Sequence, residues 1–94
     1  MTKDELQNAT AEEVFVVDIR EAEELLMQPP IPQATHIPMG QIIREAEDGN
    51  LPKDKMIVTV CRSGGRCQVT NQELAALGYE TDYLEGGMNA WNAA

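Results

Sequence analysis

The chain has 94 residues, of which 43% are hydrophobic, and a formal net charge of −9 at pH 7. This length and apolar content predict one packed domain over residues 1–94, and the acidic balance argues against a nucleic-acid-binding or anionic-membrane surface. Two cysteines are too few for a disulfide framework, and there is no apolar run long enough for a signal peptide or membrane helix, so we expect a cytoplasmic protein.

The first third of the chain alternates between helix-like and strand-like patterns. Residues 1–11 are polar and predict one or two helical turns around Leu6. Residues 14–19 form a near-continuous apolar run with β-branching, which is typical of a parallel strand covered on both faces. Residues 20–28 favour a helix with acidic residues near its start, where negative charge is stabilised, and the prolines within residues 29–32 predict a rigid loop.

The same alternation continues to the end of the sequence. The further predicted elements are an extended piece over 34–37, a helix over 39–48, a strand over 56–60, a helix over 67–77 that stops at Gly78, a strand over 81–84 and a closing helical turn that carries Trp91. The alternation predicts an α/β fold with a small, mostly parallel central sheet and helices on both faces.

A short loop connects the strand over 56–60 to the helix over 67–77. Its residues are Cys61, Arg62, Ser63, Gly64, Gly65 and Arg66. The loop follows the carboxyl end of a strand, where open α/β sheets bind ligands. Its glycines allow successive backbone N–H groups to point inward as an anion-binding nest, and its arginines and the following helix add positive charge. We therefore predict that Cys61 is a thiolate nucleophile toward an anionic substrate.

Four segments in the same order resemble the single-domain rhodanese family. They are the Asp-hydrophobic-Arg-Glu segment at 18–21, the proline-containing stretch at 29–40, the loop at 61–66 and the Leu-x-Gly-Gly-x-x-x-Trp segment at 84–91. The resemblance runs from about residue 14 to residue 91 and implies a rhodanese-like fold.

The resemblance also implies a thiosulfate sulfurtransferase. Cys61 would take the outer sulfur of thiosulfate, or of a similar small anionic donor, as a persulfide and pass it to cyanide or to a thiol, that of a protein included. Arg62 and Arg66 would hold the negative oxygens of the donor, and Ser63, Gly64 and Gly65 would complete the substrate-binding loop. We expect a monomer without a metal or cofactor, since one histidine and two cysteines with five residues between them make a poor metal site.

Two other functions remain open for the same loop. A phosphatase or arsenate reductase on this fold would use a cysteine and an arginine separated by five residues, whereas only four separate Cys61 from Arg66. The shorter ring is better matched to a sulfur atom. A rhodanese-like binding or sulfur-carrier module with little turnover is the second alternative, although such a module would be expected to lack the cysteine or the loop glycines.

The chain departs from the family pattern at two places near this loop. Pro29 and Pro30 replace a Gly-His pair, which makes the loop there stiffer. Cys67 stands where the family usually has serine. It is either a small buried thiol that fills the space of a serine or a second thiol that resolves the Cys61 persulfide or forms a reversible disulfide with it.

Several polar residues are expected to support the structure. Asp18, Arg20 and Glu21 follow a strand that ends near the loop, and we expect their hydrogen bonds to brace the neighbouring loops. His36 is a lone histidine in an extended segment, for which we also predict a structural role.

Overall fold

The computed structural model describes residues 1–93, which contain a parallel four-stranded sheet with the strand order β2-β1-β3-β4. The strands are β1 (Val14–Asp18), β2 (Thr35–His36), β3 (Met56–Val60) and β4 (Thr81–Tyr83). The helices are α1 (Lys3–Asn8), α2 (Ala22–Met27), α3 (Met39–Glu47), α4 (Gly65–Ala76) and α5 (Gly87–Trp91). The predicted α/β fold with a parallel sheet is confirmed.

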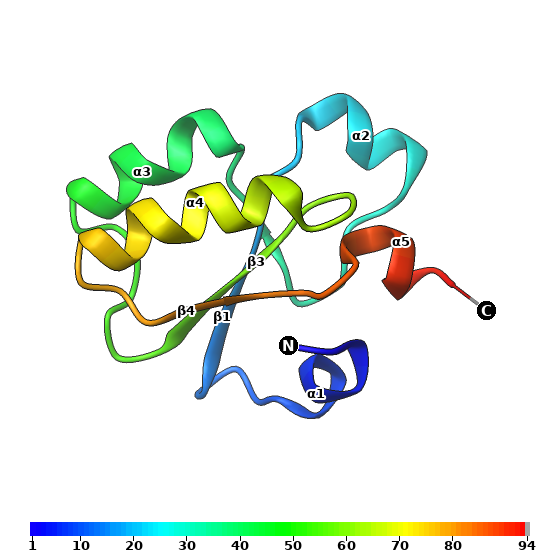
Figure 1. Ribbon diagram of the computed structural model, residues 1–94, viewed down its shortest axis with the longest axis horizontal. Helices are drawn as coiled ribbons and strands as arrows, with labels where there is room; N and C mark the ends of the chain where they lie inside the picture. Colours follow the sequence, from blue (N-terminus) through cyan, green and yellow to red (C-terminus); the bar gives the residue numbers. More distant parts are fainter. Residues whose placement is uncertain (94) are drawn as a thin grey trace.

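The two central strands bury side chains on both faces of the sheet. Because successive strand residues point to opposite faces, Val17 and Ile57 pack with the helices α3 and α4, while Val16 and Val58 pack on the opposite side toward α1 and α5. Figure 1 shows α3 and α4 above the sheet and α1 below it. This two-sided burial explains why residues 14–19 and 56–60 are apolar runs without polar alternation.

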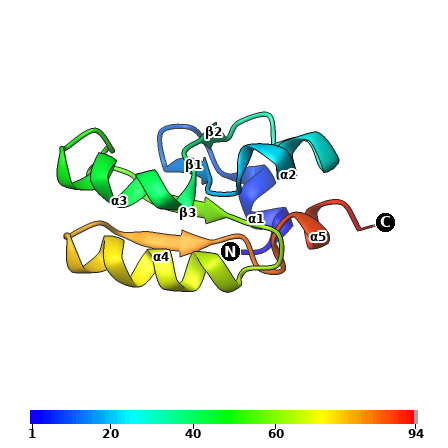
Figure 2. The same ribbon diagram turned by 90° about the horizontal axis from the view of Figure 1, so that it is seen from above.

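The end of the sheet where β3 leads into α4 is also where α2 and α5 lie (Figures 1 and 2). This is the carboxyl edge of the parallel strands, so the predicted reactive loop occupies the position that ligands favour in α/β folds. None of the helices within residues 1–93 is long and apolar enough to cross a membrane. The cytoplasmic location stays a prediction.

The helix after the loop begins two residues earlier than predicted. The sequence pattern placed its start at residue 67, but α4 begins at Gly65, so Gly65 and Arg66 belong to its first turn. The reason is the backbone of Gly64, whose φ of 107° and ψ of −15° lie in the left-handed region and turn the chain directly into the helix.

The short helix α5 closes against the loop. The backbone N–H of Met88 donates to the carbonyl of Cys61 at 2.8 Å, and that of Asn89 donates to the carbonyl of Arg62 at 3.0 Å. Gly87 makes this approach possible, because a Cβ atom there would lie 2.4 Å from the Cys61 carbonyl oxygen, and its φ is +57°. The Gly-Gly pair before Trp91 therefore serves the geometry of the loop.

Replacement of Gly87 by alanine should destabilise the protein and displace the loop. A non-glycine residue held at positive φ costs about 1–3 kcal/mol, and the contact with the loop backbone adds to this cost. Urea unfolding of Gly87→Ala measures the effect. Gly40→Ala is the matched control, because a Cβ at Gly40 in α3 meets nothing within 4 Å. Equal unfolding free energies for the two variants would contradict the proposed close packing.

Candidate active site

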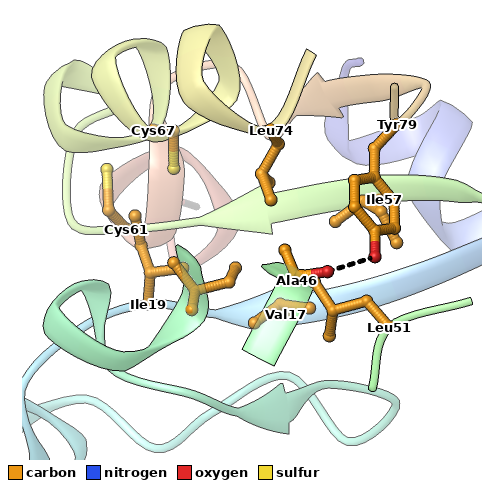
Figure 3. Close-up of a cluster of buried hydrophobic side chains, with 10 residues drawn as sticks. Val17, Ile19, Ala46, Leu51, Ile57, Cys61, Cys67, Leu74 and Tyr79 are labelled. Carbon is orange, nitrogen blue, oxygen red and sulfur yellow. Dashed lines mark hydrogen bonds between the residues drawn. The ribbon is translucent and has the colours of Figure 1, made fainter. Parts of the chain in front are cut away.

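The sulfur of Cys61 lies inside a ring of backbone donors. Cys61 follows β3 directly, is 1% exposed and turns its side chain toward the first turn of α4 (Figure 3). The N–H of Gly64 donates to Sγ at 3.0 Å, and the backbone N–H groups of Ser63 and Cys67 contribute to the lowered pKa of this thiol. The anion-binding nest expected from the glycines is thus built around the sulfur itself.

The two cysteine thiols have opposite electrostatic environments. The neighbouring side chain of Cys67, followed by the backbone donors, lowers the pKa of the Cys61 thiol to about 5 in spite of its burial. The same contact and burial raise the pKa of Cys67. At neutral pH, Cys61 is therefore a thiolate and Cys67 is an uncharged thiol, and both cysteines are free.

Arg66 is held by a carboxylate from another element. Its Nη1 and Nη2 donate to the two carboxylate oxygens of Glu24 in α2 at 2.8 Å and 2.7 Å. The hydrogen bonds from Arg66 lower the pKa of Glu24 to about 2, so the pair stays ionised at neutral pH. The guanidinium adds positive charge near the loop, but its two terminal nitrogens already have partners.

Arg62 and Ser63 lie exposed on the outer side of the loop. Arg62 also lines a cavity of about 260 Å³ between the loop and α2, together with Arg20, Glu24, Met27 and Gln28. A larger hollow of about 730 Å³ lies at the opposite edge of the sheet, around the amino ends of the strands and away from both cysteines. Of these two hollows, the one beside Arg62 lies next to the loop that carries Cys61.

Asp18 and Arg20 brace the neighbouring strand end. Arg20 is 1% exposed, and its Nη2 and Nε donate to the carboxylate of Asp18 at 2.8 Å and 3.0 Å. The backbone carbonyl of Arg20 lies 2.7 Å from Nε2 of His36. These contacts match the bracing role that the sequence predicted for Asp18 and Arg20 and the structural role predicted for His36. Glu21 instead contacts the helix that it precedes, because its backbone N–H donates to the carboxylate of Glu24 in α2 at 2.8 Å.

Glu24 is the residue of the site that the sequence analysis missed. It lies in a helix that is separated from the loop by some forty residues of sequence, and the contact carries no spacing signal. An acidic residue one turn after the Asp-hydrophobic-Arg-Glu segment was the available hint, but it was interpreted only as a charge near a helix start.

The redox role considered for Cys67 stays a prediction. Cys67 lies beside Cys61 (Figure 3) and is fully buried. Its raised pKa disfavours the thiolate that would attack an oxidised Cys61.

Comparisons with known proteins give a consistent result. The profile of the family described as rhodanese-like domain matches residues 2–94. The Bacillus subtilis protein YtwF, named as a sulfurtransferase, is 45% identical over 80 residues, which cover 85% of this chain and 75% of that protein. A sulfurtransferase of Allochromatium vinosum is 41% identical over 85 residues, covering 88% and 76%. The crystal structure of a rhodanese-like domain protein from Staphylococcus aureus superimposes with a TM-score of 0.84 at 35% identity, covering 98% and 89%.

The lowered pKa of Cys61 predicts its reactivity as a function of pH. Only the thiolate is alkylated, so the rate of reaction with iodoacetamide should be high at neutral pH and should fall as the pH drops through about 5. Intact-mass spectrometry between about pH 4 and pH 9 follows the single adduct, with Cys61→Ser as the background. A midpoint near the ordinary cysteine value of about 8.5 would contradict the nest.

Proposed function

The chain belongs to the rhodanese-like domain family, and we propose that it is a sulfurtransferase that carries the transferred sulfur as a persulfide on Cys61. The observation that carries this proposal is the Cys61 thiolate enclosed by backbone N–H donors at the end of β3. The names of the relatives support sulfurtransferase activity in general, and thiosulfate as donor and cyanide or a thiol as acceptor are part of our proposal.

The reaction proceeds in two displacements at sulfur. In the first, the Cys61 thiolate attacks the outer sulfur of thiosulfate, the sulfur–sulfur bond of the donor breaks, and sulfite leaves with the bonding electrons. Cys61 then carries a persulfide whose negative charge lies on the outer sulfur. In the second, cyanide or a thiolate attacks that outer sulfur, and the Cys61 thiolate leaves. The products are thiocyanate or a new persulfide on the acceptor.

The surroundings of Cys61 suit both displacements. The N–H groups of Ser63 and Gly64 stabilise negative charge at the sulfur. Arg62 is an exposed residue of the loop and lines the cavity, which supports its proposed contact with the sulfonate oxygens of a donor. Arg66 is anchored by Glu24, so it contributes its charge to the site while Arg62 offers the more available contacts.

The alternatives find less support. A phosphate group needs a ring that encloses an external anion, whereas the N–H of Gly64 is directed at the Cys61 sulfur and the loop is one residue shorter than a phosphatase loop. A binding module without turnover has no need of a thiolate, and the cysteine of this chain has a strongly lowered pKa.

Cys61→Ser should abolish sulfur transfer while preserving the fold, because an alcohol cannot form a persulfide. After incubation with thiosulfate, the intact mass of the wild type should rise by one sulfur atom, and that of the variant should not change. Circular dichroism checks that both proteins are folded. Thiosulfate:cyanide turnover in the folded variant would rule out the mechanism, and hydrolysis of p-nitrophenyl phosphate by the wild type without sulfur uptake would favour the phosphatase alternative.

Arg62→Ala should weaken use of the anionic donor. Loss of a charge-assisted hydrogen bond costs about 1.5–3 kcal/mol, which corresponds to very roughly ten- to a hundredfold in kcat/KM for thiosulfate. Arg44→Ala is the matched control, since Arg44 is an exposed arginine of α3 and its removal changes the net charge equally. If both variants lose donor kcat/KM to the same extent, the effect is one of net charge and Arg62 makes no specific contact.

A further inference from the structure

We propose that exposed apolar side chains of α2 and α4 form a docking surface for the sulfur acceptor, and that this acceptor is a basic protein segment in which apolar residues flank the accepting cysteine. Leu26, Met27 and Val69 make up this surface, the apolar rim. The inference rests on the proposed sulfurtransferase function, and it names the class of acceptor for the second displacement.

The exposed large apolar side chains of the protein are grouped. Within residues 1–93 they are Leu26, Met27 and Val69, with exposed fractions of 87%, 84% and 51%. One such residue alone is ordinary, but these three belong to the two helices that border the reactive loop (Figures 1 and 2). Helix α2 has no buried residue, so Leu26 and Met27 do not anchor it in the core. Their grouping at the site favours an interaction surface.

An ion pair joins the two parts of the apolar rim. Arg66 of α4 donates to both carboxylate oxygens of Glu24 of α2, at 2.8 Å and 2.7 Å. Residues three positions apart in a helix are neighbours on its surface, so Met27 lies next to Glu24 and Val69 next to Arg66. Met27 also lines the cavity between the loop and α2. The apolar rim therefore adjoins the cavity beside the reactive loop.

The size and chemistry of the apolar rim favour a transient protein partner. Cyanide is small and has no apolar area that the rim could bury. A second copy of the chain would bring another net charge of −9, and three side chains offer far less than the roughly 800 Å² that each partner buries in a stable interface. A protein that accepts sulfur must also leave afterwards, which a small contact area allows.

The charges around the apolar rim predict that the partner is basic. Glu23 is exposed and precedes Leu26 and Met27 by one helical turn, and the exposed Glu73 follows Val69 by one turn. Together with the net charge of −9, these carboxylates attract a segment that carries lysine or arginine. Positive charge beside the accepting cysteine also lowers its pKa and favours its thiolate.

Docking would bring this thiolate to the persulfide for the second displacement. The acceptor thiolate attacks the outer sulfur, so that a new sulfur–sulfur bond forms on the acceptor. The bond between the outer sulfur and Sγ of Cys61 breaks, and Cys61 leaves as the thiolate.

Blocked synthetic peptides test the proposed acceptor. The probe peptide contains one cysteine that is flanked on each side by leucine and then by lysine. One control peptide has serine in place of the leucines, and the other has glutamate in place of the lysines. After loading with thiosulfate and removal of the excess, intact mass follows loss of the sulfur from the protein. The probe should discharge the persulfide on the order of fivefold faster than either control, and equal rates for the probe and a control would overturn the proposal.

Substitutions in the protein locate the effect. Leu26→Ser should reduce the rate advantage of the probe over the serine peptide, whereas the control Ala76→Ser, at the end of α4, should keep it. Glu23→Gln should reduce the advantage of lysine over glutamate, and Glu47→Gln at the end of α3 is its control. Unchanged rate ratios in Leu26→Ser and Glu23→Gln would overturn the proposal.

Docking can also be measured without sulfur transfer. If the wild type takes up no sulfur from thiosulfate, the proposed function fails, but NMR spectra of isotopically labelled protein still test the apolar rim. The added peptide is the probe with serine in place of its cysteine. Amide shifts concentrated at Leu26, Met27 and Val69 support the docking surface, and shifts elsewhere or none overturn it. A dimer in sedimentation velocity that is lost in Leu26→Ser would overturn it in favour of a second copy.

Discussion

The structure around the site depends on keeping one negatively charged sulfur almost fully buried. A buried anion is costly unless it is hydrogen-bonded, and here the donors come from the backbone of the loop that follows Cys61. Only three residues separate Cys61 from the start of α4. The left-handed conformation of the last of them, Gly64, directs the N-terminal end of the helix toward the sulfur. Helix α5 fixes the carbonyls of Cys61 and Arg62 from outside, which leaves the N–H groups facing inward. The loop glycines and the closing Gly-Gly pair thus serve one anion from two sides.

Two of the arginines near the site form ion pairs with carboxylates. Arg20 is neutralised by Asp18 inside the protein, and Arg66 is neutralised by Glu24 at the edge of the cavity. Arg62 remains exposed on the loop. In a chain with a net charge of −9, an anionic donor is repelled at long range, and this repulsion is screened beyond about 10 Å at moderate ionic strength. Recognition of the proposed donor therefore depends on short-range contacts, such as those with the exposed Arg62.

Local patterns predicted much of this architecture, and tertiary contacts account for the remainder. The strand at 56–60 was predicted with its observed bounds, because an apolar β-branched run before a glycine-rich loop has few other interpretations. The start of α4 was wrong by two residues, since it depends on the backbone angle of Gly64 and not on residue preference. The nearness of Cys67 to Cys61 follows from a short loop, whereas the Glu24–Arg66 pair depends on where α2 lies relative to the loop. A sequence pattern carries no record of that placement.

The two buried cysteines have pKa values that are shifted in opposite directions. Neither thiol could ionise easily alone in this cluster, and two thiolates in contact would repel each other strongly. The contact between the two thiols, followed by the backbone donors at Cys61, lowers the pKa of Cys61, and the same contact together with burial raises the pKa of Cys67. The two groups then titrate as a unit, and a change at either one is felt at the other. A serine at position 67 would supply a donor without a second acidic sulfur, whereas the thiol makes the reactivity of Cys61 sensitive to the state of its partner.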